Sequence, residues 1–376
     1  MGSGADAAAG LAGDFETTEG RPAVLRVAVV GAGAFGRNHL RVYHELEAAG
    51  AGVKLCAVVD RDPAVVAAAR AQYGIDGYGS VEDLLAAGAG LDAASVCVPT
   101  VHHAAAAEML LAAGVDVLIE KPLAATLAEA DRILARAAEH GRIVQVGHLE
   151  RFNPAVTAAR EHLNRPMFFE AHRLSIFTPR SLDVDVVLDL MIHDLDIVLS
   201  LVKSAVREVR AVGLPVLSQK VDIANVRLEF ENGSIANFTA SRVSTERVRK
   251  LRFFQPRQYL SLDFARQDLL VIDAPDVGAL AGMNAEQLAA MLAAMQRGSG
   301  QGGDAQHPSA GLTLRKIAVE QGEPLRLEIE AFLAAVRVRT VPLVSGADGR
   351  AALALALAIH EAIGEHARRA GLTLAR

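Results

Sequence analysis

The sequence LRVAVVGAGAFGRNHL occupies residues 25–40 and decides the fold of the N-terminal region. Its first six residues, Leu25–Val30, are apolar apart from Arg26, which is typical of a strand buried on both faces of a parallel sheet. Gly31, Gly33 and Gly36 follow, and a helical pattern begins at about Phe35. In such a turn the glycines permit a tight bend, a close approach of the backbone to a pyrophosphate, and close helix–strand packing. The stretch therefore predicts a dinucleotide-binding turn.

Strands and helices alternate along the rest of this region. Further buried strands are predicted at Val53–Asp60, Ala93–Val98, Asp116–Ile119 and Arg142–Val146. Helices are predicted between them, beginning at Pro63 and covering His103–Ala113 and Leu127–His140. Strand, helix and strand repeated in this way indicate an α/β Rossmann domain over residues 25–148, with a parallel, doubly wound sheet.

The pattern changes after Pro154. Strands are predicted at Met167–Phe177, Glu208–Pro215, Val221–Phe230, Ser234–Ser241, Arg247–Phe254 and Tyr259–Asp263, with Asn232-Gly233 as a hairpin turn that needs positive φ at both residues. Helices are predicted at Val156–Leu163, Asp189–Val202, Met283–Gln296, Pro324–Arg337 and Asp348–Ala370. Residues 149–376 are therefore predicted to form an α+β domain with an antiparallel sheet covered on one face. We expect a mobile loop at Gly298–Gly311 and a disordered tail at residues 1–24.

Composition excludes several classes of function. A chain of 376 residues accommodates two domains, and a net charge of −6 argues against a general nucleic-acid binder. The two cysteines, Cys56 and Cys97, lie in apolar runs and predict no disulfide framework. No apolar stretch reaches the roughly 18 residues of a membrane span, and the first residues lack the pattern of a signal peptide. These features predict a cytoplasmic protein without a nucleic-acid or membrane partner.

Asp60 ends the second predicted strand and bears on the choice of cofactor. A carboxylate at this position accepts hydrogen bonds from ribose hydroxyls and repels the 2′-phosphate of NADP, which favours NAD. Arg61 follows directly and leaves NADP possible. The pyrophosphate is expected at the helix N-terminus, where free N–H groups favour anions. The predicted cofactor residues of the turn are Gly31, Gly33, Ala34, Phe35 and Gly36.

Lys121 lies in a Glu120-Lys121-Pro122 segment at the carboxyl end of a predicted parallel strand. Ligands bind at this edge of open α/β sheets. A lysine there can hold a substrate hydroxyl and share its proton while a hydride leaves the same carbon. The alternative is an exposed lysine that happens to follow a strand.

Asp189 and His193 are four residues apart on a predicted helix, so both project from one face. Histidine is the natural proton acceptor near neutral pH, and Asp189 can orient it or take the proton itself. The apolar residues around the pair favour a functional role over a merely polar helix edge.

Two further sets of residues are candidates for binding a metal ion or an anion. The histidines at positions 102, 103, 148 and 193 lack the spacing of known metal motifs, and hydride transfer needs no metal, so no metal site is predicted. A basic stretch contains Arg242, Arg247, Arg249, Lys250, Arg252 and Arg257. It indicates either a solvated strand face or a site where arginines hold a diphosphate-bearing substrate.

Several of these motifs resemble the Gfo/Idh/MocA oxidoreductases. The resemblance is carried by VAVVGAGAFGRNHL (27–40), VCVPTVHHAAAAEMLLAAGVDVLIEKPLA (96–124), VQVGHLERFNPAV (144–156), LDLMIHDLDIV (188–198), EPLRLEIEAFLAAV (323–336) and VSGADGRAALALALAI (344–359). It implies a Rossmann domain followed by an α+β domain whose open antiparallel sheet often makes oligomer contacts. It also implies NAD-dependent oxidation of a sugar hydroxyl.

The same resemblance implies roles for particular residues. Lys121, Asp189 and His193 match the catalytic Lys, Asp and His of the family. The positions that line the nicotinamide side are Pro99, Thr100, His103 and Glu120, and those near the substrate are His148, Arg151 and Asn153. Many members place a glycine pair shortly before the Asp, where this chain has Asp183-Val184-Asp185-Val186-Val187. The substrate pocket is therefore expected to differ.

The substrate expectation follows from two segments. GHLERFNPA and DLMIHDLDI look most like the branch of the family that oxidises the 3-hydroxyl of UDP-N-acetylglucosamine. One alternative is an inositol or free-sugar dehydrogenase, which shares the core motifs. A second is a regulator that binds dinucleotide without turnover. An open sheet face usually needs covering, so a homodimer or homotetramer is expected.

Overall fold

A computed structural model describes residues 24–177, 185–274, 286, 305–306 and 312–372. It divides into two compact units. The first unit combines the described residues up to Gly147 with Ile329–Gly346, and the second combines His148–Glu328 with the chain from Ala347 on. The predicted tail (1–24, apart from Val24), the predicted helix Met283–Gln296 and the predicted loop Gly298–Gly311 lie almost entirely outside the described residues.

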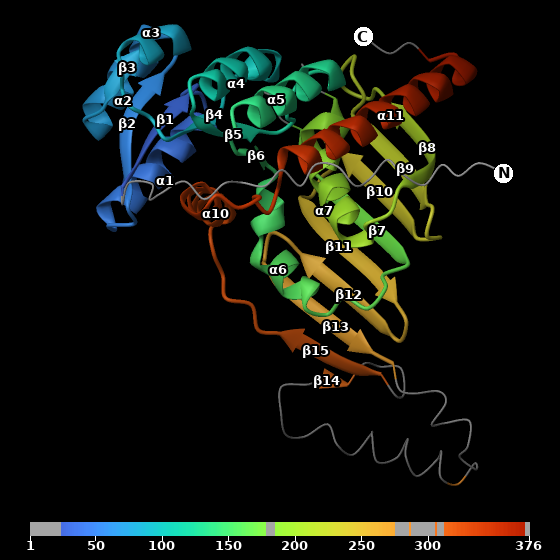
Figure 1. Cartoon of the computed structure of the whole chain (residues 1–376). Coiled ribbons are helices and arrows are strands. Elements are labelled where there is room, and N and C mark those ends of the chain that lie inside the picture. Colours follow the sequence, from blue (N-terminus) through green and yellow to red (C-terminus); the bar gives the residue numbers. More distant parts are fainter. Residues whose placement is uncertain (1–23, 178–184, 275–285, 287–304, 307–311, 373–376) are drawn as a thin grey trace, which may run out of the picture. The chain divides into compact units, whose positions relative to one another are not determined.

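The first unit contains a six-stranded parallel sheet in the order β3-β2-β1-β4-β5-β6 (Figure 1). Its strands are β1 (Leu25–Val30), β2 (Val53–Val59), β3 (Asp76–Tyr78), β4 (Ala93–Val96), β5 (Asp116–Glu120) and β6 (Val144–Gly147). Its helices are α1 (Gly36–Ala48), α2 (Pro63–Tyr73), α3 (Val81–Ala86), α4 (His103–Ala112) and α5 (Leu127–Glu139). The predicted doubly wound Rossmann sheet is confirmed, whereas β3 and α3 were not predicted because each is too short to show a period.

Local sequence explains where these helices begin. Pro63 occupies the first turn of α2, and the Asp62 side chain accepts a hydrogen bond from the Ala64 N–H. At α5, Thr126 and Glu129 form a capping box, so both backbone N–H groups at the start of the helix are satisfied.

A C-terminal segment completes the first unit. Helix α10 (Pro324–Val338) leads into it, and there Arg339 donates to the Asp116 carboxylate at 2.6 Å. The Val146 N–H in β6 donates to the Val344 carbonyl at 3.1 Å, so the segment is bonded to the edge of the sheet. No local pattern in the sequence indicates this return of the chain.

The second unit contains a nine-stranded sheet in the order β14-β15-β13-β12-β11-β7-β10-β9-β8. Its strands are β7 (Phe168–Leu174), β8 (Val206–Leu214), β9 (Ile223–Phe230), β10 (Ile235–Ser241), β11 (Val248–Gln255), β12 (Gln258–Asp263), β13 (Asp268–Asp273), β14 (Ala305–Gln306) and β15 (Thr313–Ile317). The α+β class is confirmed. The sheet is mixed rather than purely antiparallel, because β10 pairs with β7 in parallel.

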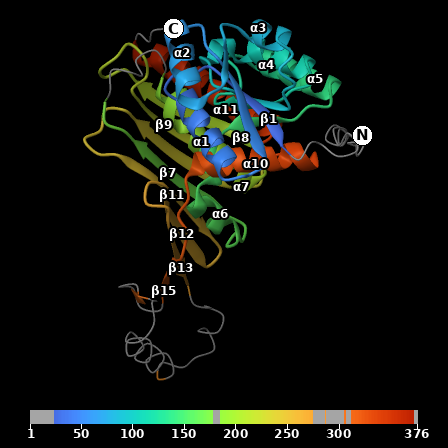
Figure 2. The same ribbon diagram turned by 90° about the vertical axis from the view of Figure 1, so that its left-hand side faces the viewer.

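Helices cover one face of this sheet. They are α6 (Pro154–Arg160), α7 (Ile192–Val202) and α11 (Gly346–Ala370), and their apolar residues share a core with sheet residues such as Phe169, Phe253 and Leu260. Figures 1 and 2 both show α6 and α7 against the same face of the strands. A π-helical turn, Val187–Met191, precedes α7, where a continuous α-helix was predicted.

The hairpin between β9 and β10 also departs from expectation. Gly233 has a φ of +82°, but Asn232 is not among the residues with positive φ. The Gly233 N–H donates to the Phe230 carbonyl, which describes a three-residue loop closed by a glycine rather than a two-residue turn. Asn232-Gly233 therefore marks the hairpin correctly, but the predicted turn type is wrong.

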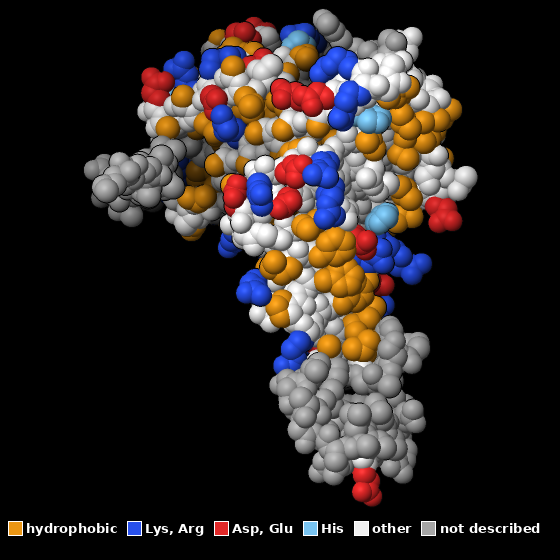
Figure 3. Space-filling view, turned by 90° about the vertical axis from the view of Figure 1, so that its right-hand side faces the viewer, with side chains coloured by type: hydrophobic (Ala, Val, Ile, Leu, Met, Phe, Trp, Pro, Cys, Tyr) orange, Lys and Arg blue, Asp and Glu red, His pale blue; other side chains and the backbone are white. Residues whose placement is uncertain are grey.

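The opposite face of the sheet carries an apolar row. Register places the row across six neighbouring strands, in the order Ile235, Phe168, Phe254, Tyr259, Ile272 and Leu314. The rings of Phe254 and Tyr259 are 4.8 Å apart, and Phe254 is 38% exposed. Figure 3 shows hydrophobic side chains forming a band over this part of the molecule. None of the helices whose residues form the described core lies on this face.

Candidate active site

The glycine turn after β1 has the geometry of a phosphate-binding loop. Gly31 has a φ of +90°, and a Cβ there would lie 2.7 Å from the Cys97 carbonyl carbon. A Cβ on Gly36 would lie 1.8 Å from the Gly31 oxygen, so only glycine lets α1 begin this close to the strand. A Cβ on Gly33 would meet nothing within 4 Å. The space above Gly33 is thus open for a ligand to approach the backbone at the start of the helix.

A cavity of about 500 Å³ adjoins this turn. It is lined from the carboxyl ends of β1, β2 and β4 by Gly31, Gly33, Asp60, Arg61, Val98, Pro99 and His102, among others. The Asp60 carboxylate accepts the Ala32 N–H at 2.8 Å and the Asp62 N–H at 2.9 Å, which fixes its position beside the turn. An open glycine backbone, a helix N-terminus and a placed carboxylate together fit a dinucleotide.

His103 connects the ends of two strands. Its ring nitrogens lie 2.9 Å from the carbonyl oxygens of Val98 and Pro122, and the side chain is buried. Burial lowers the pKa of His103 despite these carbonyl contacts. The side chain therefore holds the loop after β4 against the segment after β5, near the half-buried Thr100 and the exposed Pro99.

Glu120 and Lys121 lie at the end of β5. Lys121 is partly exposed, as a residue that meets a ligand must be, whereas Glu120 is buried. The Glu120 carboxylate lies 2.9 Å from Nε2 of His39, a residue that sequence reasoning did not single out. The only signal in the sequence was a polar residue on the predicted buried side of α1.

Asp189 and His193 belong to the second unit. Asp189 lies in the π-helical turn and His193 in the first turn of α7, and both are partly exposed. The neighbours of His193 in the chain, Ile192 and Asp194, are buried. The Asp185 carboxylate accepts hydrogen bonds from the N–H groups of Val187 and Leu188. Its Oδ1 also lies 2.7 Å from Nε2 of His360. It thereby anchors the start of the turn that carries Asp189. Such π-turns recur at functional sites.

His148 lies beside His193. The two rings meet edge to face with centroids 6.2 Å apart, and His148 is fully buried. The predicted substrate residue His148 thus contacts the predicted catalytic histidine directly.

Arg151 and Asn153 have internal partners. Asn153 caps α6 and donates to the Phe264 carbonyl at 3.0 Å. Arg151 lies 3.7 Å from the Asp196 carboxylate, and both side chains are almost completely buried. Burial raises the pKa of Asp196 to about 7, although Arg151 opposes this effect. These contacts shape the segment that carries His148.

A buried ion network joins that segment to α7. Arg173 donates to Asp194 at 2.8 Å and to Glu150 at 3.0 Å. Burial lowers the pKa of Arg173, but the two carboxylates outweigh this effect and keep the guanidinium charged. Because Glu150 is two residues after His148 and Asp194 directly follows His193, the network holds together the segments that carry the two histidines.

The basic stretch is divided between different environments. On β11, Arg249 pairs in register with Arg173 on the helix-covered side, and it lies 3.9 Å from Glu150. Lys250 and Arg252 point to the opposite face, where Arg252 contacts Glu170 at 2.9 Å. The stretch is therefore not one patch, because strand alternation separates its members.

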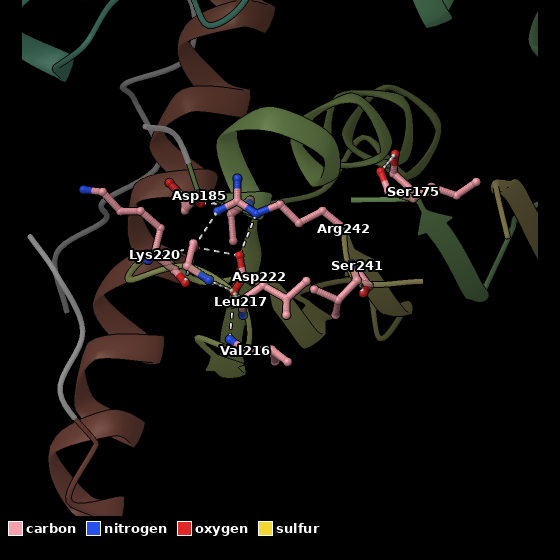
Figure 4. A network of polar contacts seen from close by, with 12 residues as sticks. Ser175, Asp185, Val216, Leu217, Lys220, Asp222, Ser241 and Arg242 are labelled. Atoms are coloured by element: carbon pink, nitrogen blue, oxygen red, sulfur yellow. Dashed lines mark hydrogen bonds and ion pairs between the residues drawn. The ribbon is translucent and has the colours of Figure 1, made fainter. Parts of the chain in front are cut away.

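Arg242 has a structural role (Figure 4). It is buried and donates to Asp222 Oδ1 at 2.7 Å. Asp222 also accepts the N–H groups of Val216, Leu217 and Ser218. Burial raises the pKa of Asp222, but the hydrogen bonds from Ser218, Val216 and Leu217 outweigh it and hold the pKa well below the usual range. The network organises the loop between β8 and β9.

Both units match known families. Residues 25–148 match the family described as "Oxidoreductase family, NAD-binding Rossmann fold", and residues 155–256 match the "GFO/IDH/MocA C-terminal domain". The chain belongs to the Gfo/Idh/MocA oxidoreductases. Its Rossmann unit is thus NAD-binding. That Gly33 and Asp60 hold this cofactor stays a prediction, which the open space at Gly33 fits.

Relatives of this oxidoreductase include sugar dehydrogenases. UDP-N-acetylglucosamine 3-dehydrogenase from Acidithiobacillus ferrooxidans is 33% identical over 340 residues, which cover 90% of this chain and 97% of the relative. A solved structure of that enzyme matches with a TM-score of 0.76 at 32% identity, over 90% of this chain and 97% of the other. Inositol 2-dehydrogenase 1 from Saccharopolyspora erythraea is 37% identical over 37% of this chain and 41% of its own.

A more distant structure shares the fold. The WlbA dehydrogenase from Bordetella pertussis, solved with NADH and UDP-GlcNAcA, matches with a TM-score of 0.68 at 18% identity, over 91% of this chain and 97% of that one. Among the described residues, no helix combines the length and apolarity needed to cross a bilayer. In the same part of the chain, no group of three His, Cys, Asp or Glu side chains is arranged to hold a metal ion.

Proposed function

We propose that this oxidoreductase oxidises the 3-hydroxyl of UDP-N-acetylglucosamine or of a closely related nucleotide sugar. The extent of the similarity carries the proposal. The nucleotide-sugar relative matches across both units, over 97% of its length, whereas the inositol relative quoted above matches over 41% of its own. A match over less than half of a relative carries less information about the substrate site than a match over nearly its whole length.

In the proposed mechanism, Lys121 holds the reacting sugar hydroxyl and His193 accepts its proton. NAD, when bound, supplies the hydride acceptor for the carbon that bears the hydroxyl. Asp189, one turn before His193, orients the imidazole, and the His148 ring restricts its rotation. Positioning and general-base assistance then lower the barrier.

Arg247 and Arg249 are the proposed partners of the diphosphate. Arg249 supports this role because it lies on the same side of the sheet as Arg173 and Glu150, which fix the His148 and His193 segments. Its side chain is 52% exposed, so it can fold over an anion.

Steady-state kinetics with UDP-N-acetylglucosamine and NAD test the assignment through the absorbance of reduced nicotinamide. Lys121→Ala and His193→Ala are expected to lower kcat by about 100-fold or more, as loss of a proton-transfer group does, with NAD affinity retained. Full activity in either variant would reject the role of that residue.

The proposed nucleotide-sugar substrate is tested separately, with control substitutions on β11. Replacing Arg247 and Arg249 with Gln should raise KM for the nucleotide sugar, whereas replacing Lys250 and Arg252 on the opposite face should not. A free sugar or an inositol has no diphosphate. If myo-inositol turns over faster than any UDP-sugar, the nucleotide-sugar assignment is wrong. If none of the UDP-sugars, free sugars and inositols turns over while NAD binds, a non-catalytic dinucleotide-binding regulator is favoured.

We also propose that the enzyme is a cytoplasmic homodimer or homotetramer assembled through the apolar row of the second unit. The row supports this because aromatic side chains on an exposed sheet face are stabilised when a second surface covers them. A two-fold arrangement would place the same row on both partners.

A further inference from the structure

His39 belongs to a chain of polar side chains buried inside the first unit. Its Nε2 lies 2.9 Å from Glu120 Oε1, and its Nδ1 lies 3.0 Å from Ser95 Oγ. The Tyr43 hydroxyl lies 2.9 Å from the same serine oxygen. His39, Ser95 and Tyr43 are all 0% exposed. Burying three polar groups between α1 and the sheet is costly unless they are hydrogen-bonded, and these contacts supply the partners.

One arrangement of protons satisfies every link of this chain. Tyr43 donates to Ser95, Ser95 donates to Nδ1 of His39, and Nε2–H donates to the Glu120 carboxylate. All three donors then point toward Glu120. His39, Ser95 and Tyr43 are fully buried, so these contacts hold the carboxylate from the interior of the unit. The arrangement is suited to fixing the position of the Glu120 carboxylate.

The strand beside Glu120 is also adapted to this carboxylate. Gly147 of β6 is the register partner of Glu120 in β5. A Cβ on Gly147 would lie 3.0 Å from the carboxylate carbon and both its oxygens, so glycine leaves room for them. The Lys121 N–H donates to Oε2 at 3.3 Å. These contacts use two of about four acceptor positions on a carboxylate, which leaves capacity for a ligand.

The place of Glu120 in the sheet indicates what that ligand is. A dinucleotide lies across the carboxyl ends of two mononucleotide-binding halves. The Asp60 side of the sheet, β1 to β3, takes the adenosine half, and β4 to β6 take the nicotinamide half. Glu120 ends β5 and can accept the amide N–H of the nicotinamide carboxamide.

We propose that His39 is a positioning residue that, with Ser95 and Tyr43 behind it, fixes Glu120 to recognise the nicotinamide carboxamide. The proposal rests on the NAD-dependent function proposed above. It requires neither the assigned sugar nor turnover.

Two substitutions at position 39 separate positioning from packing. The amide of His39→Gln reaches the place of Nε2 and keeps a donor to Glu120. The amide of His39→Asn reaches only the place of Nδ1 and keeps the Ser95 contact. The measurement is the Kd of NAD and of ADP-ribose, which lacks the nicotinamide ring, by calorimetry, with Tm recorded for each variant.

We expect His39→Asn to raise the Kd of NAD by at least about tenfold, because a hydrogen bond to a charged group is lost. The Kd of ADP-ribose should not change. His39→Gln should recover most of the NAD affinity, and Glu120→Gln should reproduce the selective loss. Ser95→Ala removes one oxygen and should cause a smaller loss of NAD affinity, again without a loss of ADP-ribose affinity. This variant replaces His39→Asn in the test if His39→Asn does not fold.

Equal weakening of NAD and ADP-ribose, or no weakening of either, would overturn the proposal. So would a wild-type protein that binds both ligands equally. None of these results depends on which sugar is oxidised, whereas failure of every UDP-sugar to react would overturn the substrate assignment and leave the role of His39 standing.

Discussion

Gly33 and Gly36 provide the sharpest test of how the turn works, because the same added methyl group should act in opposite ways at the two positions. At Gly36 the Cβ would lie 1.8 Å from the Gly31 oxygen, so the backbone must shift. Overpacking of this kind costs about 1–3 kcal/mol. At roughly 2–4 °C per kcal/mol for a unit of this size, Gly36→Ala should lower Tm by about 2–12 °C.

Gly33→Ala should leave Tm unchanged, since its Cβ meets nothing within 4 Å. The methyl group would instead occupy the space through which the pyrophosphate approaches the backbone. Losing one charge-assisted hydrogen bond costs about 1.5–3 kcal/mol, so NAD affinity should fall by at least about tenfold. Thermal unfolding and calorimetric NAD titration measure the two effects. Wild-type NAD affinity in Gly33→Ala, or a loss of Tm equal to that of Gly36→Ala, would refute this account of the turn.

Three further predictions concern the second unit. Asp222→Asn should destabilise it by about 3–5 kcal/mol at pH 7 in denaturant unfolding, because Arg242 stays buried without its anionic partner; a loss below about 1 kcal/mol would contradict this. The pKa of Asp196, raised from 3.8 to about 7, makes the folded state lose stability as pH rises through this range. The free energy of unfolding of Asp196→Asn should therefore rise by roughly 2–3 kcal/mol relative to that of the wild type between pH 5 and pH 8. A difference in Tm between the two proteins that does not change with pH would contradict the raised pKa. Phe254→Asp should dissociate the oligomer in gel filtration while Val338→Asp, at a 67% exposed position, does not.

The strands that sequence reasoning recovered are those whose pattern is long and uniform. Leu25–Val30 is apolar apart from Arg26, and its bounds were predicted to the residue. The missed elements have weaker signals: β13 follows β12 after a short turn, and β3 has only three residues. The parallel pairing of β10 with β7 is a relation between distant segments, and periodicity along one segment carries no information about it.

In the candidate site, too, the residues with a local sequence pattern could be predicted, and those that depend on distant partners could not. Gly33, Asp60 and Lys121 stand next to recognisable strand ends, so their positions follow from local pattern. The separation of Arg249 from Lys250 follows from alternation along β11, which the sequence contains, but the burial of Arg242 depends on Asp222, 20 residues away. His39 escaped notice because its meaning depends on Glu120, 81 residues later.

During synthesis, Gly147 emerges from the ribosome long before the segment that completes the first unit has been made. Until Arg339 has been synthesised, Asp116 lacks the guanidinium that contacts it in the finished fold, and the Val146 N–H lacks its carbonyl acceptor. The nucleotide-binding unit therefore reaches its final bonding only when most of the chain has emerged. An N-terminal fragment that stops at Gly147 would be an unfinished domain.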